Sequence, residues 1–179
     1  EGRVLDPVGN PTLVTTTRGA AVQTEAFQFD AADRLVRACQ DVSACPASPV
    51  KAISWGYDAV GNRVSQVRVG QATGNGTTSY TYNIADQLTQ ATVAGGASTP
   101  YTYDDNGNQV TDGAKTLAYD LENRLVSFVS GSATTTYTYD GSDKRLSRSL
   151  NGVVAARFGW DTVGGVPELA LERDGTGAL

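Results

Sequence analysis

Short runs of hydrophobic and β-branched residues alternate with polar turns along this chain, and the runs have a period of two residues. Tyr101 and Tyr103 flank Thr102, so in an extended strand the two rings lie on one face and the hydroxyl lies on the other. The segment 104–108 follows, with acids and amides that hydrogen-bond their own backbone, and Gly107 can adopt a positive φ. This pattern predicts a β-hairpin.

The same plan recurs along the chain. An aromatic residue precedes Asp or Asn, and a polar residue and then a new strand-like run follow within a few positions. The copies begin at Phe29-Asp30, Tyr57-Asp58, Tyr82-Asn83, Tyr103-Asp104, Tyr119-Asp120 and Tyr139-Asp140, with Trp160-Asp161 similar and Leu5-Asp6 degenerate. Their intervals vary, which favours hairpins joined by turns of different length over a solenoid of fixed coils.

Other turns complete the expected strand series. Asn151-Gly152 lies between the strand-like runs 145–150 and 153–160, and both turn residues tolerate the positive φ of a type I′ turn. The stretch 39–49 is an excursion between strands expected at 35–38 and 52–57. The sequence therefore predicts an all-β fold of successive antiparallel β-hairpins.

These staggered copies resemble the YD-repeat or Rhs-repeat family, which includes bacterial Rhs proteins, the C components of insecticidal toxin complexes, and the animal teneurins. The resemblance implies a curved, spiralling sheet that is part of a hollow β-shell. It also implies that the repeat residues are structural. These positions are Phe29, Asp30, Tyr57, Asp58, Gly61, Tyr82, Tyr103, Asp104, Gly107, Tyr119, Asp120, Tyr139, Asp140, Trp160 and Asp161.

The resemblance also suggests a domain organisation. Residues 1–159 are expected to form an array of about six to seven hairpins, and residues 160–179 are similar to the start of the Rhs-associated core. The chain contains no Met, so we interpret it as an internal fragment of a larger protein. Its one Asp-Pro-x-Gly sequence, residues 6–9, lies at the opposite end from the family's self-cleavage motif, so no catalytic residue is assigned.

Composition narrows the function classes. The net charge of −5 and the pI near 4.6 argue against nucleic acid, whose phosphates call for clustered Lys and Arg. The chain contains no run of about 18 apolar residues, so we expect no membrane-spanning segment. With no His in the chain, and with the Asp residues in turns, an enzyme is disfavoured.

Two candidate ligand or bonding sites remain. Cys39 and Cys45 are spaced to form a disulfide in an oxidising compartment, the alternative being two reduced thiols in a loop. Asp104, Asn106 and Asn108 match the first positions of a calcium loop, but the twelfth position is Lys115 rather than Glu. We therefore expect no metal and no cofactor.

Two functions compete. The first is a structural segment of a β-shell that encapsulates a C-terminal toxin or effector of a secreted bacterial protein. Its partners would be the rest of the parent polypeptide and that effector. The alternative is a teneurin-like cell-surface adhesion or carbohydrate-binding module that contacts glycans or a receptor, which would require solvent-facing Trp55 and Trp160. Either function places the protein outside the cell or at its surface.

Overall fold

The computed structural model describes residues 1–178, and in this range every regular element is a β-strand. The predicted all-β fold is confirmed. Strand contacts divide the chain into two compact units, Glu1–Thr99 and Pro100–Leu179.

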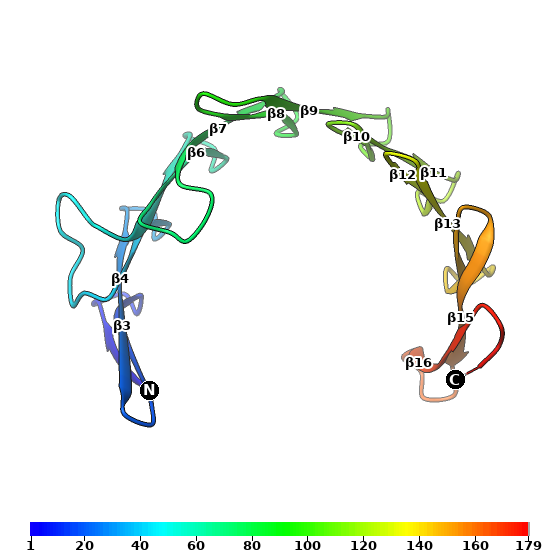
Figure 1. Ribbon diagram of the computed structural model, residues 1–179, viewed down its shortest axis with the longest axis horizontal. Helices are drawn as coiled ribbons and strands as arrows, with labels where there is room; N and C mark the ends of the chain where they lie inside the picture. Colours follow the sequence, from blue (N-terminus) through cyan, green and yellow to red (C-terminus); the bar gives the residue numbers. More distant parts are fainter. Residues whose placement is uncertain (179) are drawn as a thin grey trace. The chain divides into compact units, whose positions relative to one another are not determined.

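The first unit contains eight strands that pair in chain order, each antiparallel to the next (Figure 1). Because each strand pairs with the one before and the one after it, the hairpins form one continuous layer within the unit. The strands are β1 (Gly2–Leu5), β2 (Pro11–Arg18), β3 (Ala21–Phe29), β4 (Leu35–Gln40), β5 (Ala52–Tyr57), β6 (Arg63–Val69), β7 (Gly76–Tyr82) and β8 (Leu88–Val93).

The second unit repeats this arrangement. Its antiparallel strands again follow chain order, and the type I′-like hairpin expected at Asn151-Gly152 is confirmed, with φ of 49° and 81°. The strands are β9 (Ser98–Tyr103), β10 (Gln109–Asp112), β11 (Lys115–Tyr119), β12 (Leu125–Ser130), β13 (Ala133–Tyr139), β14 (Arg145–Leu150), β15 (Val153–Asp161) and β16 (Glu168–Asp174). The first two residues of β9 fall before the boundary between the units, which lies at Thr99 and Pro100.

The two faces of each layer differ in chemistry, as the two-residue period predicts. On β9 the Tyr101 and Tyr103 side chains are half-buried and alternate with exposed Thr102, whose hydroxyl bonds that of Thr111 on the neighbouring strand. We call these the aromatic face and the hydroxyl face. Next to the aromatic residue the pairing register shifts by one, for example between Gly56 and Tyr57.

Very little of the chain is buried. Among the described residues, the buried side chains are those of Ala26, Cys39, Ala52, Ser147 and Ala156. The accessible surface is 11373 Å². A compact globule of this mass would expose about 8,300 Å², and two separate globules of half the mass about 10,000 Å² in total. Each unit is therefore a layer stabilised by strand-to-strand contacts rather than by a central core.

Candidate functional site

The Asp that follows each aromatic residue builds its turn by bonding the backbone. Asp30 Oδ1 accepts the N–H of Ala32 at 2.9 Å and that of Arg34 at 3.0 Å. The backbone closes the same turn, since Asp30 N–H donates to the carbonyl of Arg34 and Asp33 N–H donates to the carbonyl of Asp30. One carboxylate oxygen thus replaces two backbone acceptors where the chain reverses. We call this five-residue unit an Asp turn.

The same bonds recur along the described chain, and in every Asp turn the fourth residue has a positive φ. Gly, Asn and Asp occupy this position because they tolerate the left-handed region best. The turns begin at Asp6, Asp30, Asp58, Asn83, Asp104, Asp120, Asp140 and Asp174, and their fourth residues are Gly9, Asp33, Gly61, Asp86, Gly107, Asn123, Asp143 and Gly177.

Two positions depart from what the aromatic-Asp pattern suggests. Among the residues that the structure describes, Asp161 Oδ1 accepts the N–H of Val163 alone, and a longer connection, residues 162–167, leads to β16. Asp174 forms a complete Asp turn that the sequence analysis missed, because Arg173 and not an aromatic residue precedes it. The signal that could have found it is the Asp-Gly-Thr-Gly sequence itself.

The fifth residue of one turn reaches the fourth residue of the next. Asn62 Nδ2 donates to Asp58 Oδ2 of its own turn at 3.1 Å and to Asp86 Oδ1 of the following turn at 2.8 Å. The same pair of bonds joins Asn10 to Asp6 and Asp33, and Asn108 to Asp104 and Asn123. A ladder of side-chain amides and carboxylates therefore links consecutive turns.

Where the fifth residue is Arg, it reaches further into the next hairpin. Arg34 pairs with Asp30 at 2.8 Å, donates to the backbone carbonyl of Asp58 at 3.0 Å, and lies over the ring of Tyr57 at 4.8 Å from its centroid. Arg124 makes the equivalent contacts with Asp120, Asp140, Asp143 and Tyr139. Each of these arginines therefore combines a salt bridge to an Asp with a cation–π contact to a Tyr ring.

Tyrosine and tryptophan side chains that precede turns bond the preceding hairpin. Tyr57 Oη donates to the carbonyl of Leu35 at 2.9 Å, Tyr139 Oη to that of Leu125 at 2.8 Å, and Trp160 Nε1 to that of Arg145 at 2.9 Å. Tyr82 Oη makes the corresponding bond to Arg63. Each acceptor is the first residue of the returning strand one hairpin earlier.

These hydrogen bonds stabilise the ionised carboxylates. The backbone N–H of Arg34 and then its side chain lower the pKa of Asp30, and the side-chain amide of Asn108 lowers that of Asp104. The N–H groups of Lys144 and Ser142 lower the pKa of Asp140. Hydrogen bonds to the charged form are the common cause.

Both oxygens of Asp104 accept hydrogen bonds inside its own turn, from the N–H groups of Asn106 and Asn108 and from the Asn108 amide. The calcium-loop alternative would need these oxygens as ligands. Within residues 1–178, no group of three or more His, Cys, Asp or Glu side chains is placed to hold a metal ion. In the same range no helix has the length and apolar character needed to span a membrane.

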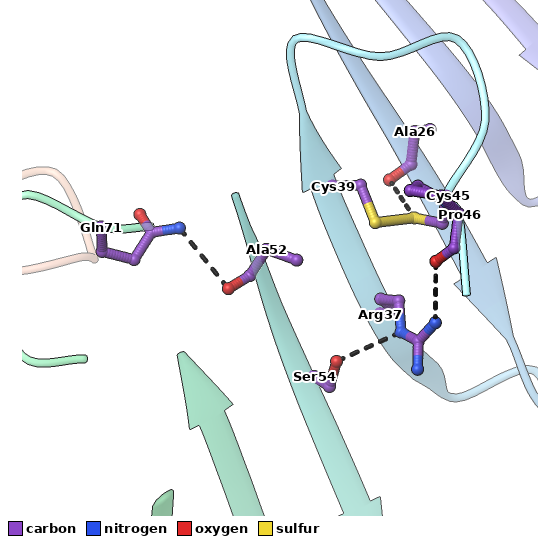
Figure 2. The surroundings of a disulfide bond; sticks show 8 residues. All are labelled: Ala26, Arg37, Cys39, Cys45, Pro46, Ala52, Ser54 and Gln71. Atoms are coloured by element: carbon purple, nitrogen blue, oxygen red, sulfur yellow. Dashed lines mark hydrogen bonds between the residues drawn. A yellow bond between two sulfur atoms is a disulfide. The ribbon is translucent and has the colours of Figure 1, made fainter. Parts of the chain in front are cut away.

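Cys39 and Cys45 form a disulfide that ties a loop to one face of the first unit (Figure 2). Arg37 lies beside it, with Nε donating to Ser54 Oγ at 3.2 Å and Nη1 to the carbonyl of Pro46 at 3.4 Å. The Cys45 sulfur lies 3.4 Å from the carbonyl oxygen of Ala26. A disulfide sulfur has no proton to donate, so we treat this as a close contact rather than a hydrogen bond.

Hairpins that pair in chain order, joined by Asp turns and by aromatic residues that bond the hairpin before, define a repeat protein built of β-hairpins. The chain belongs to the YD-shell family: the family model described as Teneurin YD-shell matches residues 23–166. The predicted family resemblance is confirmed. A search of the curated proteins finds no match.

Solved structures of toxin complexes share the fold. The crystal structure of TcdB2-TccC3-Cdc42 has a TM-score of 0.60 at 14% identity and covers 89% of this chain and 9% of that one. The Photorhabdus luminescens Tc holotoxin pore has a TM-score of 0.54, and TcdB2-TccC3-TEV one of 0.53, both at 14% identity over 98% of this chain and 11% of those chains. This chain thus spans about a tenth of the length of these neighbours.

Proposed function

We propose that this chain is a wall segment of a β-shell that encloses a C-terminal toxin or effector of a secreted bacterial protein. The partners of the segment are the rest of the parent polypeptide and the enclosed effector. The segment itself is structural rather than catalytic, and residues 160–179 begin the Rhs-associated core.

The observation that carries this proposal is the single-layer sheet whose hairpins bond one another in series. A layer with two exposed faces and little buried volume does not enclose an active-site cleft of its own. It is suited instead to separate the space on one face from the space on the other. The surface excess of the chain over compact globules fits a wall whose faces meet other material. The fold shared with the TcdB2-TccC3 structures supports the same role.

The placement of the indoles makes us prefer a wall to a carbohydrate-binding platform. Trp55 and Trp160 are both half-buried, and Trp160 donates its Nε1–H to the preceding hairpin. A stacking platform for sugars presents open aromatic faces, whereas rings that pack between hairpins contribute about 0.5 to 1.5 kcal/mol per pair to the wall.

The test uses the parent protein with its C-terminal region. Native and denaturing gels, with mass spectrometry of each fragment, show whether a C-terminal piece is retained in the native particle. We expect this piece to resist added protease until the wall is loosened. A C-terminal region that is digested as fast in the native particle as after denaturation would contradict the proposal.

Neighbouring aspartates provide a matched pair of variants for this test. Asp104→Ala removes the acceptor of two backbone N–H groups, whereas Asp105→Ala changes an exposed residue outside those bonds. We expect protease to reach the C-terminal region faster in Asp104→Ala and at the parent rate in Asp105→Ala. Equal rates in both variants would argue that this segment is not part of the barrier.

A further inference from the structure

The loop of residues 41–50, here called the disulfide loop, covers an apolar row on the first unit. The pairing register aligns one residue from each of five strands, β2 to β6, on the hydroxyl face: Leu13, Ala26, Cys39, Ala52 and Val69. The three central members, Ala26, Cys39 and Ala52, are 1%, 0% and 1% exposed. They are the buried side chains among the described residues of this unit, and Ala26 and Cys39 border the clefts that loop residues line.

The ends of the disulfide loop are held by the strands. Gln40 N–H donates to the carbonyl of Lys51 at 3.0 Å, Asp41 N–H to that of Thr24 at 2.8 Å, and Lys51 pairs with Asp41 at 3.3 Å. These bonds lie at the base of the loop and do not depend on its middle.

The middle of the loop has only two bonded attachments to the sheet within the described chain. They are the Cys39–Cys45 disulfide and the solvent-exposed 3.4 Å hydrogen bond from Arg37 to the carbonyl of Pro46 (Figure 2). An exposed hydrogen bond of that length contributes little to stability. The covalent bond is therefore the principal attachment.

The loop is also loosely packed against the layer. A solvent-open cleft of about 350 Å³ is bordered by Cys39, Val42, Pro46 and Val50, and a second of about 310 Å³ by Leu13, Ala26 and Cys45. Loop atoms that border these clefts lack the dispersion contacts that dense packing would provide. Packing alone is therefore a weak force for keeping the loop closed.

We propose that the Cys39–Cys45 disulfide is a redox-operated latch whose reduction releases the disulfide loop and exposes the apolar row, while strands β2 to β6 stay paired. The reductant is a dithiol. Its thiolate attacks Cys45, because Cys45 is partly exposed whereas Cys39 is fully buried.

The exchange balances in two steps. The dithiol's first sulfur bonds to Cys45 Sγ while the Cys39–Cys45 bond breaks, and Cys39 leaves as a thiolate that takes up a proton. The second sulfur of the dithiol then displaces Cys45, which also ends as a thiol. Two electrons pass to the protein, and the dithiol becomes a cyclic disulfide.

Single-cysteine variants of the whole chain test the release. Cys45→Ala leaves Cys39 as the only thiol, and Cys39→Ala leaves only Cys45, whose maleimide labelling rate is the reference for an accessible thiol. With the latch absent, we expect Cys39 to react within about tenfold of Cys45, because thiol reactivity follows exposure. A gap larger than tenfold overturns the proposal, since the loop would then stay closed without its disulfide.

A third variant shows whether any opening is local. Ala156→Cys, in a chain with both native cysteines changed to Ala, places a thiol at a site 2% exposed in the second unit. We expect its labelling to be at least about a hundredfold slower than that of Cys45, as for a buried thiol. Fast labelling there would also overturn the proposal, because a buried site that the loop does not cover would then open as readily as Cys39.

The wild-type chain supplies the last comparison. Treatment with dithiothreitol should raise the fluorescence of an apolar-surface dye severalfold, and reoxidation should reverse the rise. Arg37→Ala keeps the disulfide and should bind dye like the untreated wild type. Dye fluorescence that does not change on treatment with the dithiol would contradict a disulfide latch. So would a rise in oxidised Arg37→Ala as large as that in the reduced wild-type chain.

Discussion

At the scale of single residues, the fourth position of the Asp turn serves two requirements at once. Asp33, Asp86 and Asn123 adopt a positive φ and also accept the amide of the preceding turn's fifth residue. Gly relieves the backbone strain but offers no acceptor. Arg34, whose next turn has Gly61 at this position, donates to the backbone carbonyl of Asp58 alone, whereas Arg124 donates both to the carbonyl of Asp140 and to the fourth-position Asp143 carboxylate. Backbone strain and the choice of ladder partner are thus coupled.

The strain can be measured separately from packing in a pair of glycines. Gly61 has φ of 106° and Gly141 lies outside the positive-φ region, and a Cβ at either position meets nothing within 4 Å. We expect Gly61→Ala to lower the free energy of unfolding by about 1 to 2 kcal/mol, because Ala disfavours this φ. Gly141→Ala is the control, and urea denaturation gives both values. Equal effects would show that the φ at position 61 is not required.

The turn carboxylates also make stability depend on pH. In the folded chain Asp30, Asp104 and Asp140 have pKa values below the ordinary 3.8, so folding favours their ionised forms. Their contribution is complete above that ordinary value and is lost as pH falls through the lower folded pKa values. Urea midpoints from about pH 6 down to about pH 2.5 should therefore decline below about pH 4.

Asn83, which builds the same turn without a titrating group, suggests the matching variant. Asp140→Asn should keep its turn and show a shallower decline of the urea midpoint at low pH. A decline as steep as that of the parent chain would mean that the carboxylate of residue 140 does not contribute to the pH dependence.

At the scale of elements, a hydroxyl or an indole N–H joins a hairpin to the one before it where Tyr or Trp precedes the turn. Tyr57→Phe removes the bond from Tyr57 Oη to the carbonyl of Leu35 and leaves the ring in place. We expect a loss of about 1 kcal/mol in the free energy of unfolding. Tyr80→Phe is the control, because within residues 1–178 the Tyr80 ring stacks under Arg63 but its hydroxyl has no hydrogen bond. Equal losses would argue against a specific role of the Tyr57 bond.

Local patterns were sufficient to predict most hairpins. The expected strands at 35–38, 52–57 and 145–150 correspond to β4, β5 and β14, because alternation and turn chemistry act over a few residues. The Asp174 turn was not predicted because the residue before it is Arg173, whereas the pattern requires an aromatic residue there. The ladder from Asn62 to Asp86 and the burial of Ala26 under the disulfide loop depend on partners 24 and 19 residues away. Such contacts require the register of several strands, which local patterns do not give.

At the scale of the whole molecule, every strand contact recorded for the described residues joins strands that are consecutive in the chain. Stability in such an array is close to a sum of hairpin terms and nearest-neighbour terms. A mutation that destabilises one hairpin should therefore destabilise its neighbours without unfolding the rest of its unit. This behaviour would distinguish a wall segment from a domain with one cooperative core.

Hydrogen exchange on Tyr57→Ala tests this locality within the first unit. The ring is half-buried, so we expect a local loss of about 2 kcal/mol, less than the 3 to 5 kcal/mol of a buried aromatic. Protection should fall in β4 to β7, since Tyr57 bonds Leu35 on β4 and β5 pairs with β6. Protection in β1 and β2 should stay near the parent level, because those strands have no contact with β5. A uniform loss across the first unit would instead show that its hairpins unfold together, so that the nearest-neighbour description fails.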